Sequence, residues 1–315
     1  MILVTGATGF IGRALVRQLS ETGQRVRVLL RPSPRSPRLP KGVPVEVAVV
    51  SLNDASGVRA ALRGVDEIYH LASAGGQGQK GSLLKTDIEG TRTLAQVAAS
   101  ADIKHLVYLS QIGADRASAF PIHKSKGIAE EHIRKSGVPH TIIRSSVIFG
   151  PEDGFTTTLA GFLRLSPGLM PIPGDGRTLL QPLWVEDLVT CLTWTLANPN
   201  MVNQTYEIGG GEYFTLRQVL ETIMSVTHTR RLLMSLPPPY MRALFVILDS
   251  FSRNFAASTY WIDYVAVNRT CPVDNISRTF GLMPARFAYR LNYLAREPWH
   301  TSLTKKLQET FRISR

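Results

Sequence analysis

ILVTGATGFIG, residues 2–12, opens the chain and decides its fold. Ile2 to Thr5 are all apolar or β-branched, which is typical of a short buried strand. Three glycines follow at three-residue intervals, and the next segment, from Arg13 to Leu19, places apolar side chains at helical spacing. The stretch therefore predicts a strand, a glycine turn and a helix in direct succession.

Glycines in this arrangement let the backbone come close to a phosphate group. Without side chains they permit a tight turn, and the free N–H groups at the start of the helix attract the charge of a pyrophosphate. A strand, a glycine turn and a helix form the context that a dinucleotide-binding site requires. A glycine turn with a purely structural role is the alternative. The candidate cofactor contacts in this stretch are Gly6, Thr8, Gly9, Phe10, Ile11 and Gly12.

Strand and helix patterns alternate along the chain, which predicts a parallel, doubly wound sheet covered by helices on both faces. We therefore expect an α/β fold of the Rossmann type, with a smaller, mostly helical C-terminal domain on the substrate side. The dinucleotide-binding domain is expected at 1–150, with 177–210 returning to it, and the smaller domain at 151–176 and 211–315. The expected strands are 2–5, 25–30, 43–50, 67–71, 105–110, 140–144 and 205–208, and the expected helices are 13–19, 55–62, 82–100, 122–136, 185–196 and 216–226, the last capped by Thr215.

Length and composition are those of an ordinary globular protein. The 315 residues are 44% hydrophobic and 19% charged, which excludes a disordered chain. The two cysteines have no metal-type spacing, so we expect a reducing compartment and no metal site. Because the strand pattern starts at residue 2, we expect no leader peptide and a cytoplasmic location.

The net charge of +12 is strongly positive. The basic residues are scattered and are not interleaved with aromatic residues, so no nucleic-acid partner is predicted. Two interpretations stay open: a basic surface in solution, or a peripheral contact with an anionic membrane or an acidic partner. The apolar segment 240–248 is too short to span a membrane. We interpret it as a packed helix, with a membrane-surface helix as the alternative.

The end of the second predicted strand bears on the choice of cofactor. In dinucleotide-binding proteins an acidic residue about 20 positions beyond the glycines binds the ribose hydroxyls. Here Arg31 stands at the strand end, and no acidic residue occurs between Glu21 and Glu46. A guanidinium binds a 2′-phosphate through paired hydrogen bonds. We therefore expect NADP(H), with NAD(H) as the less favoured cofactor and a solvated Arg31 as the structural alternative.

Together the motifs resemble the extended short-chain dehydrogenase/reductase superfamily, the NAD-dependent epimerase/dehydratase group. They follow the family's order from residue 1 to about 226, and the resemblance adds Leu71 and Ala72 to the expected cofactor contacts. From Trp261 onward the chain is similar to the atypical branch that includes nucleotide-binding accessory subunits of respiratory complex I. The matching stretches are TGATGFIG (5–12), GVDEIYHLAS (64–73), EGTRTL (89–94), HLVYLS (105–110), TIIRSSVIFGPED (141–153) and PLWVEDLV (182–189).

Catalysis in this superfamily uses a tyrosine four positions before a lysine. The tyrosine exchanges the proton, and the lysine lowers the tyrosine pKa and holds the nicotinamide ribose; residues four apart share one helix face. Here Lys126 stands at the lysine position but Ile122 at the tyrosine position, and no tyrosine in the chain has a lysine four residues later. The resemblance places Ser110, or its neighbour Gln111, at the position of the substrate-orienting hydroxyl.

Other positions near this motif also depart from the family. Asp87 stands where the family often has asparagine. His123 titrates near neutrality when exposed to water and is a candidate proton donor, although it points about 100° away from Ile122 on the helix. The alternatives are a surface or capping role for His123 and an exposed helical role for Lys126. The candidate catalytic residues are Lys126, Ser110 and His123.

The cofactor site is better preserved than the chemical site, so two functions stay open. The first is an NADP(H)-binding oxidoreductase or epimerase-like enzyme that lacks the usual tyrosine. The second is a non-catalytic NADP(H)-binding scaffold or assembly protein that docks on a membrane complex or another partner. The resemblance also implies a homodimer through the helices at 82–100 and 122–136. Neither the substrate nor the oligomeric state follows from the sequence.

Overall fold

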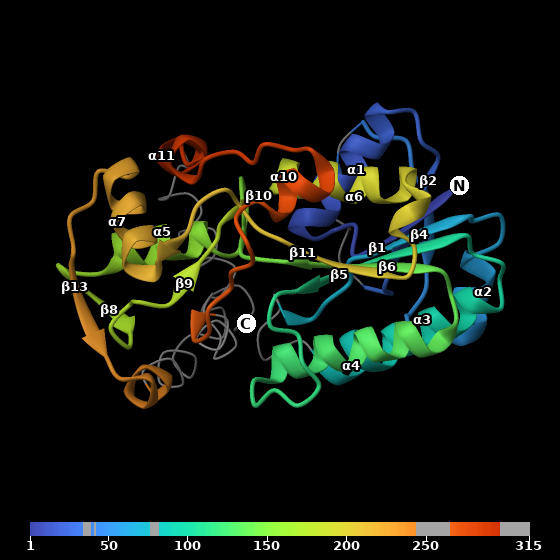
Figure 1. The fold of residues 1–315 in the computed structure, drawn as a ribbon, viewed down its shortest axis with the longest axis horizontal. Coiled ribbons are helices and arrows are strands. Elements are labelled where there is room, and N and C mark those ends of the chain that lie inside the picture. Colours follow the sequence, from blue (N-terminus) through green and yellow to red (C-terminus); the bar gives the residue numbers. More distant parts are fainter. Residues whose placement is uncertain (34–38, 41, 76–81, 244–264, 297–315) are drawn as a thin grey trace, which may run out of the picture.

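A seven-stranded parallel sheet forms the centre of the fold in the computed structural model, which describes residues 1–33, 39–40, 42–75, 82–243 and 265–296. The strand order is β11-β6-β5-β4-β1-β2-β3, so the direction of winding changes between β1 and β4 (Figure 1). All six pairings are parallel. The strands are β1 (Ile2–Thr5), β2 (Val26–Leu30), β3 (Glu46–Val49), β4 (Glu67–His70), β5 (His105–Gln111), β6 (His140–Ser145) and β11 (Gln204–Ile208).

Helices cover both faces of this sheet (Figure 1). One face packs against α1 (Phe10–Glu21) and α6 (Val185–Ala197) around one apolar core, and the other packs against α2 (Ala55–Ala61), α3 (Gly90–Ala99) and α4 (Pro121–Ser136) around a second core. Successive strand residues point to opposite faces, so Val4 enters the first core and Leu3 the second. The doubly wound α/β fold is confirmed, and all seven predicted strands belong to this sheet.

The helix expected at 82–100 is divided in two. Its first part, η2 (Leu84–Glu89), is a π-helix, and the α-helical part α3 begins only at Gly90. Asp87 lies within the π-helix and is fully buried. Such wide turns occur frequently at functional sites, and here the turn carries a residue that meets α4.

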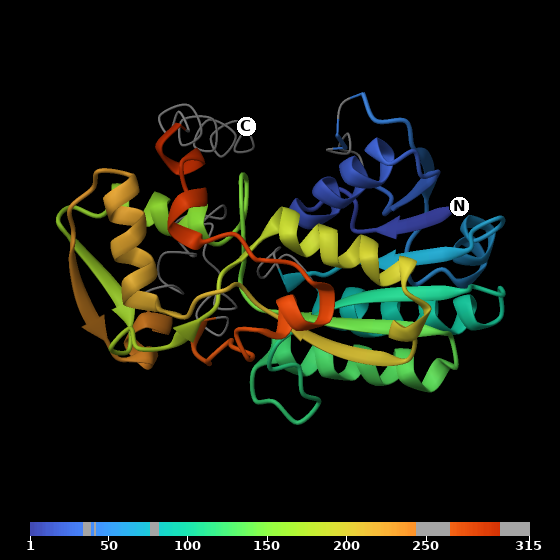
Figure 2. The same cartoon turned by 45° about the horizontal axis from the view of Figure 1, so that its top comes forward.

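The remaining elements lie mostly at the other end of the molecule (Figure 2). Most of them surround a third apolar core, to which α5 (Thr156–Leu165) and α7 (Leu216–Val226) contribute, whereas Ile276 belongs to the first core. The predicted cap of α7 is confirmed, because Thr215 and Gln218 form a capping box. The others are β7 (Ile148–Phe149), β8 (Leu169–Pro173), β9 (Leu179–Leu180), β10 (Leu183–Trp184), η3 (Pro199–Met201), β12 (Phe214–Thr215), β13 (Leu232–Leu236), α10 (Asn275–Phe280), η4 (Phe287–Arg290) and α11 (Tyr293–Arg296).

The C-terminal part that is expected to be mostly helical also contains a strand, β13, which pairs in parallel with β8. The division of the chain into two domains with the stated boundaries stays a prediction. Of the apolar segment 240–248, residues 244–248 lie outside the described residues, and residues 240–243 are helical. None of the helices in the described part of the chain is long and apolar enough to cross a membrane.

Candidate functional site

The turn between β1 and α1 is closed so tightly that only glycine fits at two of its positions. Gly6 has a φ of +73°, and a Cβ there would lie 2.8 Å from the backbone of Leu71 and Ala72 at the end of β4. A Cβ on Gly12 would overlap the carbonyl group of Gly6. On Gly9 the nearest atom to a Cβ would be 3.2 Å away. The backbone therefore supplies the turn and the close helix–strand packing that a pyrophosphate site needs.

No side chain caps the first turn of α1, because the residue at its N-cap position is Gly9. Phe10 and Ile11 turn their side chains to the apolar core, so their contribution to a ligand is their backbone N–H groups. The guanidinium of Arg13 donates to the carbonyl of Thr8 at 3.0 Å and to Glu152 at 2.6 Å. A dinucleotide pyrophosphate therefore fits the residues of this turn, and Arg13 fixes their backbone.

The other predicted cofactor contacts lie at the same carboxyl edge of the sheet. Arg31 follows β2, which pairs directly with β1, and its side chain is exposed. Leu71 and Ala72 follow β4 on the opposite side of β1, and the N–H of Ala72 donates to the hydroxyl of Thr5 at 3.3 Å. This edge beside the winding reversal is where open α/β sheets bind their ligands.

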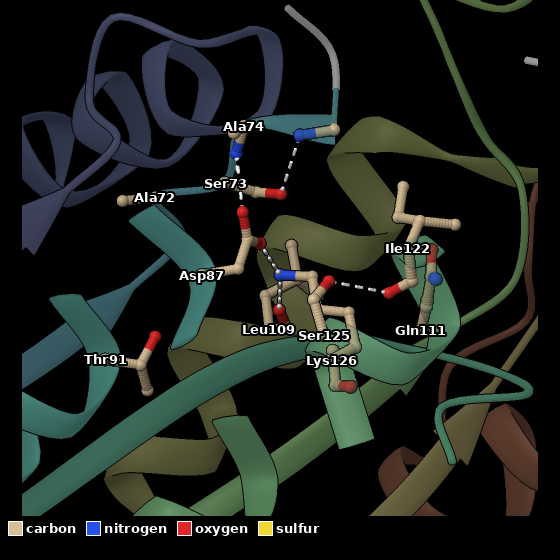
Figure 3. A network of polar contacts seen from close by, with 12 residues as sticks. Ala72, Ser73, Ala74, Asp87, Thr91, Leu109, Gln111, Ile122, Ser125 and Lys126 are labelled. Atoms are coloured by element: carbon tan, nitrogen blue, oxygen red, sulfur yellow. Dashed lines mark hydrogen bonds and ion pairs between the residues drawn. The ribbon is translucent and has the colours of Figure 1, made fainter. Parts of the chain in front are cut away.

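Lys126 is buried, so the alternative of an exposed helical lysine is wrong. Its Nζ lies 3.4 Å from Oδ1 of Asp87, donates to the carbonyl of Leu109 at 3.3 Å and stands 4.9 Å from the ring centre of Tyr108 (Figure 3). The second carboxylate oxygen of Asp87 accepts the N–H of Ala74 at 2.8 Å. Burial alone would lower the pKa of the lysine, but Tyr108 and Asp87 raise it above its ordinary value. Lys126 is therefore a cation at neutral pH.

Ile122 precedes Lys126 by one turn of α4 and is surrounded by apolar groups. It forms a small cluster with Ala74 and Leu83, and its Cδ1 lies 2.6 Å from the place that a Cβ on Gly75 would take. Figure 3 shows Ile122 on the same helix as Lys126 and Ser125, whose hydroxyl donates to the carbonyl of Ile122 at 3.0 Å. An apolar group therefore stands at the position that the resemblance gives to a proton donor.

The hydroxyl of Ser110 is engaged on the α4 side of the sheet. It donates to Glu130 at 2.6 Å. The carboxylate of Glu130 also accepts two hydrogen bonds from Arg144, at 2.9 and 2.7 Å, and one from Arg134 at 2.9 Å. Ser110 is thus part of a buried ion-pair network between α4, β5 and β6.

His123 and Gln111 meet a residue that comes from the far end of the sequence. Nη2 of Arg269 donates to Oε1 of Gln111 at 3.1 Å and lies 3.4 Å from Nε2 of His123. All three side chains are buried. Burial and the charge of Arg269 lower the pKa of His123 to about 4, so the expectation that it titrates near neutrality is wrong, as is the surface alternative. The irregular segment around Arg269 has no periodic pattern that predicts this contact.

The described residues contain no cluster of histidine, cysteine and acidic side chains able to bind a metal ion. Cys191 and Cys271 are buried and unpaired, and burial raises the pKa of Cys271 to about 11. Thiolate chemistry at neutral pH is therefore unfavourable at Cys271.

Comparison with known proteins agrees with this geometry. Residues 6–160 match the family model described as NAD(P)H-binding. The mitochondrial NADH dehydrogenase [ubiquinone] 1 alpha subcomplex subunit 9 of Arabidopsis thaliana is 28% identical over 247 residues, which are 76% of this chain and 61% of that longer protein. Sterol demethylase protein B of Methylococcus capsulatus is 29% identical over 276 residues, which cover 80% of this chain and 82% of the relative.

The fold is likewise shared with solved structures. A UDP-glucose 4-epimerase of Thermus thermophilus in complex with NAD superposes with a TM-score of 0.69 at 21% identity. The superposition covers 93% of this chain and 97% of that one. At this level of identity the likeness concerns the fold.

Proposed function

Because residues 6–160 form an NAD(P)-binding domain of the NAD-dependent epimerase/dehydratase and short-chain dehydrogenase/reductase superfamily, we propose that the chain is an NADP(H)-dependent oxidoreductase working without the family's tyrosine. The observation that carries the proposal is the buried Lys126 cation, held between Leu109 and Asp87, whose carboxylate also binds the N–H of Ala74 after β4. A bound nicotinamide supplies the hydride in such chemistry. The protein's own residues have to bind the cofactor, orient the substrate and provide a proton.

Cofactor binding is assigned to the carboxyl edge of the sheet. Gly9 closes the turn through its N–H, which donates to the carbonyl of Gly6 at 3.0 Å. The amides of Phe10 to Gly12 bind the pyrophosphate, the backbone at Leu71 and Ala72 lines the cleft, and the guanidinium of Arg31 binds the 2′-phosphate of NADP(H). Support for these roles comes from the closed turn at Gly6 and Gly12 and from the position of Arg31 beside β1.

The proton is assigned to Lys126. It is a buried cation, and Tyr108 and Asp87 favour its charged form. Its ammonium donates a hydrogen bond to the nicotinamide ribose and supplies the proton that a substrate oxygen takes up when it receives a hydride. Ser110 and His123 act as positioning residues, Ser110 through Glu130 and His123 through Gln111 and Arg269.

Titration with NADPH and NADH tests the cofactor assignment. We expect the unmodified chain to bind NADPH more tightly than NADH. Arg31→Ser should lower the affinity for NADPH about tenfold or more and change the affinity for NADH little, because a charge-assisted hydrogen bond contributes about 1.5–3 kcal/mol. The matched control is Arg59→Ser, which removes an exposed arginine from α2 and should leave the affinity for both cofactors unchanged. Tighter binding of NADH by the unmodified chain would overturn the assignment.

The second candidate function is a non-catalytic scaffold that binds NADP(H). It is favoured by the apolar cluster of Ile122, Ala74 and Leu83, which offers no proton. The Arabidopsis relative, named as a subunit of an NADH dehydrogenase subcomplex, also supports it. A chain that binds NADPH yet oxidises none with a broad panel of ketones and aldehydes would favour the scaffold over the enzyme.

A further inference from the structure

We propose that the outward face of the ribbon formed by β8 and β13 docks on an anionic lipid membrane. This ribbon lies at the opposite end of the molecule from the N-terminus (Figures 1 and 2). It is independent of the cofactor site, so the inference does not depend on the proposed function.

The ribbon packs one face on the core and turns the other face to water. On the inner face Met170, Ile172 and Leu233 pack against the third apolar core. On the outer face Leu232 pairs with Leu169, and both side chains are exposed, by 69% and 48%. A sheet face turned to water ordinarily carries polar residues. On this ribbon the face turned to water is apolar, which needs an explanation.

The exposed apolar surface extends along and beyond the ribbon. Met234, two residues after Leu232 and on the same face, is 45% exposed and pairs with Pro171. Leu165, at the end of α5, is 57% exposed. A hydrogen bond from Arg231 to the carbonyl of Arg164 brings the end of α5 beside the start of β13. Contiguous apolar groups on a surface mark an interaction site.

The charge around this surface selects the partner. Residues 156–177 and 216–243, which build this end of the molecule, contain six arginines and two acidic residues, Asp175 and Glu221. Arg230 and Arg231 immediately precede the exposed leucine of β13. Apolar side chains fringed by arginine suit the boundary between lipid head groups and acyl chains, where each basic residue near an anionic surface contributes about 1 kcal/mol. A protein partner would need acidic residues placed opposite these arginines, whereas an anionic lipid membrane carries negative charge over its whole surface.

Flotation of the full chain with lipid vesicles tests the inference. We expect the chain to float with vesicles of mixed phosphatidylcholine and phosphatidylglycerol and to remain in solution with pure phosphatidylcholine. Binding should weaken with salt, because exposed charges are screened. Arg230→Gln should lower the partition coefficient about fivefold, as expected from the loss of one exposed basic contact. The paired substitutions Leu232→Ser and Met234→Ser should lower it at least tenfold.

The controls lie on the helices that pack on the large sheet, away from the ribbon. Leu84→Ser, in η2, changes a leucine that is also 57% exposed, and Arg92→Gln removes one exposed arginine from α3; both should leave flotation unchanged. NADPH binding and the melting temperature report that every variant is folded. Flotation that is insensitive to the ribbon substitutions overturns the inference. It is also overturned if the chain ignores both kinds of vesicle while Leu232→Ser changes its molecular mass in solution, because the face then binds a second copy.

Discussion

Ile122 is the residue at which the proposed chemistry is most directly tested. Its side chain stands one helical turn before the buried Lys126 and is enclosed by Ala74 and Leu83. We expect Ile122→Tyr to raise the rate of NADPH-dependent carbonyl reduction, because a hydroxyl would stand one turn from Lys126, where a positioned acid contributes about 10²-fold or more. The larger ring should also lower stability by about 1–3 kcal/mol through overpacking. Steady-state kinetics and thermal melting measure the two effects.

Ile122→Phe separates the hydroxyl from the ring. The two aromatic variants crowd Gly75 and Leu83 alike, so their melting temperatures should fall by similar amounts. Only the tyrosine variant should gain turnover. Equal rates in both variants would show that the hydroxyl has no role here, and the scaffold function would then be favoured.

At the level of single residues, the contacts that were predictable from sequence are those fixed by local backbone geometry. Gly6 and Gly12 are required because a Cβ at either position meets backbone a few residues away or on the adjacent strand. The partners of Lys126 and His123 come from elsewhere. Asp87 is reached through a π-helix and Arg269 through an irregular segment 146 residues beyond His123. No spacing rule joins positions so far apart.

Among the elements, those of the large sheet were predictable and β13 was not. The strands of the large sheet are short apolar runs that alternate along the chain with amphipathic helices, whose apolar residues recur every 3.6 residues. The run LLMSL at 232–236 is also short and apolar, but its strand partner β8 lies 63 residues earlier. A short apolar run of this kind is ambiguous between helix and strand until its partner is known.

The contact between η2 and α4 gives a prediction about an element pair. Asp87→Asn removes the carboxylate beside the Lys126 ammonium and leaves a buried cation without its counter-charge. We expect the free energy of unfolding at pH 7 to fall by about 3 kcal/mol, as for other broken buried pairs. Urea denaturation measures this change. NADPH affinity should fall as well, because Lys126 loses the contact that holds it.

The pH dependence of this effect follows from the pKa of Lys126. That pKa is raised above its usual 10.5 in the folded chain, so the stabilisation is complete below pH 10.5 and is lost as the pH rises through the raised value. The difference between Asp87→Asn and the unmodified chain should therefore shrink in strong alkali. Asp54→Asn is the control, because asparagine caps a helix as well as aspartate and should change stability little. A variant as stable as the parent would mean that the ion pair contributes nothing.

For the whole molecule, buried histidines predict sensitivity to acid. Burial lowers the pKa of His70 to about 3 and that of His105 to about 4, and burial with the charge of Arg269 lowers that of His123 to about 4. In the unfolded chain all three regain a pKa near 6.5, so below this pH the unfolded state binds more protons. Near pH 5 the free energy of unfolding should fall by about 4 kcal/mol for each pH unit of acidification, about 1.4 kcal/mol from each histidine.

Urea denaturation between pH 7 and pH 5 measures this slope, and His105→Gln isolates one contribution to it. Glutamine keeps a donor that can face the hydroxyl of Thr141, which now lies 2.8 Å from the His105 ring, but takes up no proton. The slope should therefore fall by about a third. His228→Asn changes an exposed histidine and should leave the slope intact. If His105→Gln and the parent chain lose stability equally with falling pH, protons bound elsewhere, and not the buried histidines, unfold this protein in acid.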